Sequence, residues 1–426
     1  MLLLYVLADT VRTRKIDRLV SQLKSPDPAA RDAARKELTG LKSHADMRRL
    51  IRHLADDDEP GTGDVAAILA AVGAPALKPL AAAAAKATDI SFRERLHYAL
   101  RTERWLPWRK GTVFRDGPFV GSFGSTRQAR TKSGILRTFV LIGPPAVDTL
   151  VTLSRNRRAP VRQLAIESLK GIHDPRAFDT FVHALKDPDV DIRIAAVDGL
   201  DGLKMMALAV LNDPSPGNYD IAAWREYDSK DETAIEPLLA CLDDVYEQGS
   251  TTVPFALKYY HDDPRVAARL AAIVRDPKTR KYIRLLAAYS IKDSKNPRLS
   301  EALADPAVAA WLIASLADRD DNIRSWAARI LTNVPDKRKF APVASLLGDK
   351  NPVVQKYARD FFLECPDADR VPALAAAYES ANETGKKNAV EVLKDIRDRD
   401  AQLTDEAKSA LERIAPDSPS TDSTLK

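Results

Sequence analysis

Six segments of the chain share one spacing of apolar and small side chains. When each segment is aligned on its first apolar residue, such side chains recur mostly at offsets 0, 3, 4, 7 and 8. This spacing predicts a helix that buries one face. The segment Ile323, Trp326, Ala327, Ile330 and Leu331 follows it without exception. The six segments begin at Ala30, Val161, Ile192, Ile283, Ile323 and Val354.

Two positions within these segments are nearly constant. Offset 4 is alanine in all six, and so small a side chain lets a second helix approach closely. Offset 1 is arginine in five and Gln355 in the sixth. These arginines could form a ladder for a polyanion, but we expect them to bond to acidic groups of a neighbouring repeat, such as Asp187 and Asp318. The alanines are Ala34, Ala165, Ala196, Ala287, Ala327 and Ala358, and the arginines are Arg31, Arg162, Arg193, Arg284 and Arg324.

A partner helix is predicted in addition to the shared segments. Just upstream of three segments stand Asp27-Pro28, Asp187-Pro188 and Asp276-Pro277, where Asp can cap a helix and Pro suits its first turn. The distances from Val161 to Ile192 and from Ile323 to Val354 are both 31 residues. Two helices in a unit of this length indicate a helical array. The partner helices contain residues 19–23, 181–185, 238–242, 312–316 and 343–347.

The run Asp-Pro-Asp-Val-Asp-Ile-Arg-Ile-Ala-Ala at 187–196 resembles the HEAT-repeat consensus, particularly the short bacterial form named after phycobilisome lyases. The resemblance covers most of residues 12–415 and is weaker near 60–100 and 205–275. It implies an all-α fold, an α-solenoid of stacked antiparallel helix pairs, over residues 1–415. Families with such repeats include bilin lyase subunits, scaffold proteins, a DNA glycosylase family and deoxyhypusine hydroxylase, so the resemblance does not choose a function.

Residues 101–134 interrupt the helical pattern with a basic insertion that is rich in aromatic residues. We expect it to connect the two helices of one repeat, between a helix that ends near Leu100 and one that starts near Ile135. Eight basic and two acidic residues give it a charge of +6, which exceeds the net charge of +5 for the whole chain. The stretch 112–120 around Asp116-Gly117 is compatible with a small β-hairpin.

Basic side chains interleaved with aromatic ones suit a phosphate-bearing or acidic surface. The alternative is that the aromatic residues pack the loop against the solenoid and the charges are solvated. The next turn within a repeat is also basic, and such turns lie along one edge of a solenoid, so we predict a basic stripe that contacts nucleic acid, an anionic lipid surface or an acidic protein. The candidate binding residues are Trp105, Trp108, Arg109, Lys110, Arg115, Arg127, Arg130, Lys132, Arg155, Arg157 and Arg158.

Composition adds little to this picture. The chain has 65 Lys and Arg against 60 Asp and Glu, a balance too even to establish an anionic partner although the sequence pI is 9.0. Cys241 and Cys365, the two cysteines, lie far apart and form no disulfide framework, so a reducing compartment, the cytoplasm, is expected. The apolar run 2–8 is too short to cross a bilayer. It is interpreted as part of the first solenoid helix or as a trimmed or unusual targeting segment.

No set of residues with catalytic or metal-binding spacing stands out, so we expect no cofactor and no metal. The six histidines form no His-Glu pair, which argues against the di-iron hydroxylase. The glycine-rich run 121–125 lacks the Lys-Ser/Thr ending of a phosphate loop. Residues 416–426 are predicted to be a disordered tail. The histidines are His44, His53, His97, His173, His183 and His261.

The sequence therefore favours a non-enzymatic scaffold that binds a protein partner through its repeat surface and its basic loop. Two alternatives remain. One is a nucleic-acid-binding HEAT-like protein with a role in DNA repair, and the other is an accessory or lyase-type subunit of an enzyme complex. The oligomeric state is not predicted.

Overall fold

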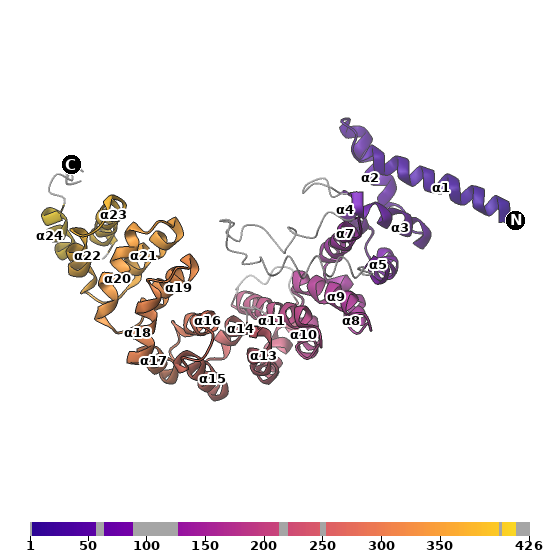
Figure 1. The fold of residues 1–426 in the computed structure, drawn as a ribbon. Coiled ribbons are helices and arrows are strands. Elements are labelled where there is room, and N and C mark those ends of the chain that lie inside the picture. The colour runs from indigo at the N-terminus through magenta and orange to yellow at the C-terminus, as the bar shows by residue number, and fades with distance from the viewer. Residues whose placement is uncertain are drawn as a thin grey trace. The chain divides into compact units, whose positions relative to one another are not determined.

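The computed structural model describes residues 2–56, 64–87, 127–212, 220–247, 253–399 and 403–414. Every regular element in these ranges is a helix. The helices pair and stack as in an α-solenoid, which confirms the predicted fold class (Figure 1). The chain divides into two compact units, residues 1–256 (unit 1) and 257–426 (unit 2), and each is described by itself.

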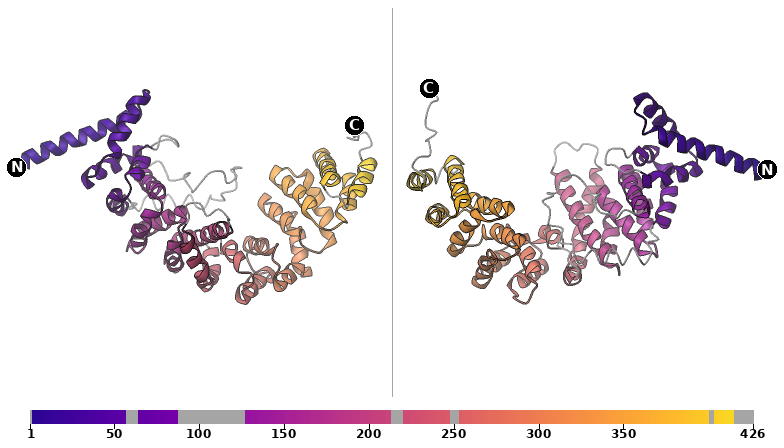
Figure 2. Two further views of the ribbon diagram at one scale, coloured as in Figure 1. Left: turned by 180° about the vertical axis from the view of Figure 1, so that it is seen from behind. Right: turned by 45° about the horizontal axis from the view of Figure 1, so that its top comes forward.

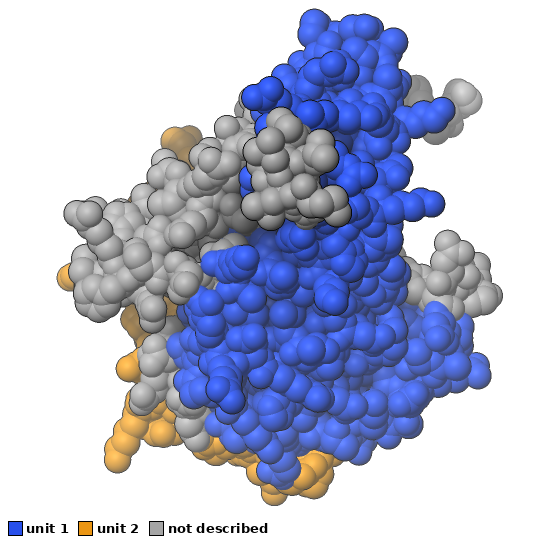
Figure 3. Space-filling view, turned by 90° about the vertical axis from the view of Figure 1, so that its right-hand side faces the viewer, with its two compact units in different colours: residues 1–256 blue, residues 257–426 orange. Residues whose placement is uncertain are grey.

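Unit 1 is built from two layers of helices. The first helices of successive repeats are α1, α3, α5, α8 and α10, and the second helices are α2, α4, α7, α9 and α11. The second helices of neighbouring repeats pack side by side. Figure 2 shows the helices of unit 1 following one another from indigo to magenta, and Figure 3 shows one closely packed face of this unit in blue. The bounds are α1 Leu2–Gln22, α2 Pro28–Thr39, α3 His44–Ile51, α4 Asp64–Val72, α5 Ala74–Ala87, α7 Arg127–Ile142, α8 Val147–Leu153, α9 Ala159–Ile172, α10 Phe178–Ala184, α11 Val190–Leu211, α12 Ile221–Lys230 and α13 Ile235–Glu247.

Unit 2 repeats this arrangement after α14 (Val253–Leu257), the helix in which the division between the units falls. Its second helices α16, α19, α21 and α23 pack in sequence, while α18, α20, α22 and α24 form the other layer together with α15 and α17. The bounds are α15 Pro264–Arg275, α16 Lys281–Ile291, α17 Pro297–Ala304, α18 Pro306–Ser315, α19 Asp321–Leu331, α20 Phe340–Ser345, α21 Pro352–Glu364, α22 Arg370–Tyr378, α23 Glu383–Arg399 and α24 Thr404–Ile414.

Several helices begin where an acceptor side chain meets free backbone N–H groups. Asp27 accepts a hydrogen bond from the N–H of Ala29 at 3.0 Å, which caps α2 as predicted. At α11 the cap is Asp189, two residues after Asp187. Asp276 does not cap α16, because it ends α15 instead.

The core lies between the two layers of each unit. All six alanines at offset 4 are buried, each with at most 1% of its surface exposed, as the prediction of a closely packed partner helix requires. In the predicted partner helices, Leu19, Phe181 and Leu312 are buried as well. At Gly199, a Cβ atom would come within 2.5 Å of the Phe181 ring, so α10 and α11 approach each other closely.

The structure changes one boundary of the predicted insertion. Helix α7 begins at Arg127 rather than near Ile135, so residues 127–134 are helical. Helices α5 and α7 pack against each other, and residues 88–126 stand between them in the sequence. The predicted hairpin at 112–120 and the tail at 416–426 lie outside the described residues.

The apolar start of the chain lies in α1, which packs on α2 and α3 through buried residues such as Ile16, Leu19 and Val20. Among the described residues, no single helix has the length and apolar composition needed to cross a membrane. One consecutive pair, Lys132–Ile142 and Pro144–Leu153, passes that test together but is bent by 115°.

Candidate interaction surface

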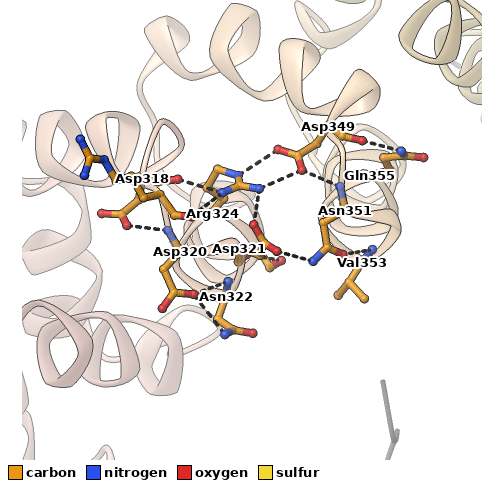
Figure 4. A network of polar contacts seen from close by, with 11 residues as sticks. Asp318, Asp320, Asp321, Asn322, Arg324, Asp349, Asn351, Val353 and Gln355 are labelled. Carbon is orange, nitrogen blue, oxygen red and sulfur yellow. Dashed lines mark hydrogen bonds and ion pairs between the residues drawn. The ribbon is translucent and has the colours of Figure 1, made fainter. Parts of the chain in front are cut away.

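The arginine at offset 1 of α19 makes the most complete polar junction between repeats (Figure 4). Arg324 donates from Nε and Nη2 to the two carboxylate oxygens of Asp349 at 2.9 and 2.8 Å. Nη2 also donates to Asp321 at 2.7 Å, and Nη1 donates to the carbonyl of Asp318 at 2.8 Å. The hydrogen bond with Asp349 raises the pKa of Arg324 although burial opposes it. A planar guanidinium thus ties the turn before α19 to the turn before α21.

Arg162 makes the equivalent junction in unit 1. It donates from Nε and Nη2 to the carboxylate of Asp187 at 2.7 and 2.8 Å, and from Nη1 to the carbonyl of Asn156 at 3.0 Å. Its pKa is raised, chiefly by the hydrogen bond with Asp187. The prediction that these arginines bond to acidic groups of the next repeat is therefore correct for Arg162 and Arg324. The charge of both arginines is therefore paired with a carboxylate inside the array.

A second contact recurs in five of the six repeats. The side chain at offset 1 donates to the carbonyl six residues earlier, which closes the turn between the two helices of its own repeat. The donor and acceptor pairs are Arg31 and Ser25, Arg162 and Asn156, Arg193 and Asp187, Arg324 and Asp318, and Gln355 and Asp349. Glutamine can replace arginine here because a single N–H donor suffices.

Arg284 makes neither the ion pair with the next repeat nor the hydrogen bond to the carbonyl six residues earlier. It is buried, donates from Nε to the carbonyl of Val274 at 2.6 Å, and lies with its guanidinium 4.0 Å from the centre of the Trp311 ring. Burial lowers its pKa, against the influence of Asp276 and Asp305. The carboxylate that would match its position, Asp318, pairs with Lys281 instead.

The basic turn between α8 and α9 is exposed in part. Arg155 and Arg157 are exposed and form no ion pair or side-chain hydrogen bond within the described part of the chain. Arg158 is exposed too, but it donates from Nη1 to the carbonyl of Ala85 at 2.8 Å. Since Ala85 is in the last turn of α5, this bond places the basic turn beside the point where residues 88–126 leave α5.

Lys132 does not belong to an exposed surface. Its side chain is buried between α7 and α9, and its ammonium donates to Gln163 at 3.2 Å. Burial lowers the pKa of Lys132, while Glu167 and Asp191 act in the opposite direction. Arg127 and Arg130 are on α7, with side chains outside the description. Trp105, Trp108, Arg109, Lys110 and Arg115 lie outside the described residues.

The described residues bring together no group of three or more His, Cys, Asp or Glu side chains able to hold a metal ion. His53 contacts Asp17 at 2.9 Å, and His173 ends α9 in the left-handed conformation with φ 53°. Cys241 and Cys365 are both buried. Each of these residues has a structural position in the helical array.

A cluster of side chains on the second helices of unit 2 is not predicted by the sequence pattern. Tyr289 of α16 and Trp326 of α19 meet edge to face with ring centres 4.4 Å apart. Arg329 of α19 lies over Tyr289 and over Tyr357 of α21, at 5.5 and 5.4 Å from the ring centres. Trp326 and Tyr357 occupy offset 3 of the repeat pattern, which predicts burial, but both of them, like Tyr289 and Arg329, are only half-buried. The signal was the aromatic residue at offset 3 in two successive segments.

Comparison with known proteins identifies HEAT repeats in part of the chain. A family model described as HEAT repeats matches residues 147–213, the region of α8 to α11. No curated protein matches the chain. An engineered protein of known structure is 16% identical over 94% of this chain and 98% of its own, with a TM-score of 0.41.

The karyopherin Kap121p bound to the SUMO protease Ulp1p is 12% identical over 95% of this chain, with a TM-score of 0.36. Kap121p bound to RanGTP is 13% identical over 95%, with the same TM-score. The chain spans only 47% and 46% of these Kap121p chains. Residues 147–213 thus match the HEAT-repeat family, within a chain that folds as an α-solenoid.

Proposed function

We propose that this protein is a non-enzymatic interaction scaffold that docks an acidic protein along the edge of unit 1 formed by the turns within its repeats. The observation that carries the proposal is the exposed pair Arg155 and Arg157, which has no counter-charge in the described chain. The offset-1 arginines Arg162 and Arg324 are excluded from this surface, because they donate to carboxylates of the next repeat. Lys132 is excluded because it is buried.

The hydrogen bond from Arg158 to Ala85 supports the proposal that the basic α8–α9 turn and the basic insertion form one stripe. It holds the α8–α9 turn against the last turn of α5, the helix after which the insertion follows in the sequence. Arg109, Lys110 and Arg115, with Trp105 and Trp108, are proposed to extend the stripe. A rigid helical array that presents exposed charge on its turns suits the recognition of a folded or extended acidic partner.

The test compares four chains as baits in an extract of the source organism, with the retained proteins quantified by mass spectrometry. The baits are the native chain, Arg155→Glu/Arg157→Glu, a chain without residues 101–126, and the control Lys295→Glu/Arg298→Glu. The control makes the same charge change at two exposed residues of unit 2. The proposal expects a partner that the native and control chains retain and the other two lose.

Retention of the same partner by the charge-reversed chain would contradict the proposal. The extract is treated with nuclease, so that a nucleic acid cannot bridge bait and partner. A direct interaction of labelled single-stranded DNA with the native chain, lost on charge reversal and weakening steeply with salt, would favour the nucleic-acid-binding alternative instead. Copurification with the subunits of one enzyme would favour the alternative of an accessory or lyase-type subunit, which the resemblance of residues 187–196 to the short bacterial repeat suggests.

A further inference from the structure

The face formed by the second helices of unit 2 carries one guanidinium without a counter-charge. Arg329 projects from α19 between Tyr289 of α16 and Tyr357 of α21. No hydrogen bond or ion pair involves Arg329 within the described chain, and its Nε atom is enclosed without an acceptor. Its terminal nitrogens are not among the enclosed atoms, so they face solvent. These terminal nitrogens are therefore available to donate to a ligand.

Three cations at the C-terminal end of α16 and on α21, near this cluster, are paired. Lys292 contacts Asp293 at 2.5 Å, Lys356 contacts Asp360 at 2.6 Å, and Arg359 contacts Glu391 at 2.8 Å. These pairs cancel, so Arg329 is the solvent-facing guanidinium without a counter-charge among the described residues of α16, α19 and α21. A nucleic acid would need several unpaired cations to bind its regularly spaced phosphates. One unpaired guanidinium flanked by aromatic rings fits one carboxylate next to an apolar side chain.

We propose that Tyr289, Trp326, Arg329 and Tyr357 form a docking site for an extended acidic peptide segment of a protein partner. The terminal nitrogens of Arg329 donate to an Asp or Glu carboxylate of that segment. The rings of Tyr289, Trp326 and Tyr357 contact the apolar residues beside it. Because the four side chains come from three consecutive second helices, the segment crosses α16, α19 and α21. This site is distinct from the basic edge of unit 1.

The test pans a phage-displayed library of random twelve-residue peptides against the full chain and measures binding of the recovered peptides by fluorescence polarisation. We expect recovered peptides to share an Asp or Glu beside an aromatic or branched apolar residue. Replacement of that acid by its amide should weaken binding roughly ten- to hundredfold. Arg329→Gln should weaken it equally, with no further loss when both changes are combined. Arg329→Lys keeps the charge but not the fork, and should give an intermediate affinity.

The matched control is Arg359→Gln, which makes the same chemical change on the same face at a guanidinium that already has Glu391. It should leave affinity within about twofold. Arg155→Glu/Arg157→Glu should also leave it unchanged, which separates this site from the proposed function. The proposal is overturned if no peptide is recovered, if the peptides lack an acidic residue, or if they bind the Arg329→Gln chain equally well. Binding of single-stranded DNA that requires Arg329 would also overturn it, in favour of a nucleic-acid ligand.

Discussion

Arg324 and Arg284 have the same position in two neighbouring repeats of unit 2, but they stabilise the array in different ways. Arg324 meets the carboxylate of the next turn and uses its donors on Asp349, Asp321 and the Asp318 carbonyl. Arg284 meets no carboxylate and relies on one backbone carbonyl and the face of Trp311. The same residue type in the same register therefore makes either an ionic or an aromatic junction.

The turn before each helix explains the difference. Residues Ser25, Asn156, Asp187, Asp318 and Asp349, six before offset 1, each accept a hydrogen bond from the backbone N–H two residues later. Before Arg284 this place is held by Lys278, which has no acceptor. The turn there is held by Asp276 instead, which accepts from the N–H of Lys278 at 2.9 Å. A turn closed two residues earlier gives Arg284 a different set of acceptors.

The largest expected effect is at the ionic junction. Asp349→Ala should lower the free energy of unfolding of the cooperative unit by about 3–5 kcal/mol, because it leaves the buried charge of Arg324 without its main partner. Urea denaturation gives the magnitude, and hydrogen exchange of α19 and α21 shows where the loss occurs. The control is Asp360→Ala, which removes an ion pair to the exposed Lys356 and should cost at most about 1 kcal/mol. Equal losses for the two variants would refute the assigned role of the junction.

The next effect tests whether the junction of unit 1 is equivalent. Arg162→Gln should cost about 2 kcal/mol, since glutamine can keep the bond to the Asn156 carbonyl, as Gln355 does at its own turn, but loses the carboxylate of Asp187. The midpoint of thermal denaturation should fall, with faster hydrogen exchange in α9. If Arg162→Gln is as stable as the native chain, the intra-repeat bond rather than the ion pair holds this junction.

A smaller effect is expected at the aromatic junction. Arg284→Met should cost about 1 kcal/mol, because methionine keeps contact with Trp311 while one hydrogen bond and the cation–π contact are lost. Its urea midpoint is compared with that of Asp349→Ala in the same buffer. The contrast between the junctions fails if Arg284→Met proves the more destabilising of the two.

The smallest expected effect is a dependence of the protein's stability on pH in the acidic range. A hydrogen bond from Asn351 lowers the pKa of Asp321, so this carboxylate contributes stability above its unfolded pKa of about 3.9. That contribution is lost as the pH falls through the lower pKa of the folded state. Thermal denaturation between pH 5 and pH 2 should show it. Asn351→Ser, which can still cap α21 but has no amide to donate, should reduce the dependence, and an identical pH profile would count against this account.

Much of this fold follows from local spacing. The alanines at offset 4 mark the buried face correctly, because only a small side chain fits where two helices touch. The repeat pattern does not identify α23, although Ala389 is buried at the position equivalent to offset 4. The reason is that Gly385 and Asn388 stand where the pattern has apolar residues, at offsets 0 and 3. In the folded chain Asn388 is satisfied by the Leu347 carbonyl at 2.7 Å. A polar residue whose partner is 41 residues away cannot be recognised as buried from the sequence.

The candidate site was predictable only in part. Charge counts drew attention to Lys132, Arg155 and Arg157 alike, yet burial separates the first from the other two. Conversely, nothing in the sequence distinguishes Arg329 from the other helical arginines. Its candidate role is visible only in the structure, where it lies over Tyr289 and Tyr357 on the adjacent helices.

The sequence by itself determined the helices, the repeat and the buried stripe, because these depend on residues within one or two turns of one another. Only the tertiary structure decided which arginines are neutralised inside the array and which remain available. That choice depends on whether a carboxylate from the next repeat reaches the guanidinium, as Asp349 reaches Arg324 and none in the described chain reaches Arg329.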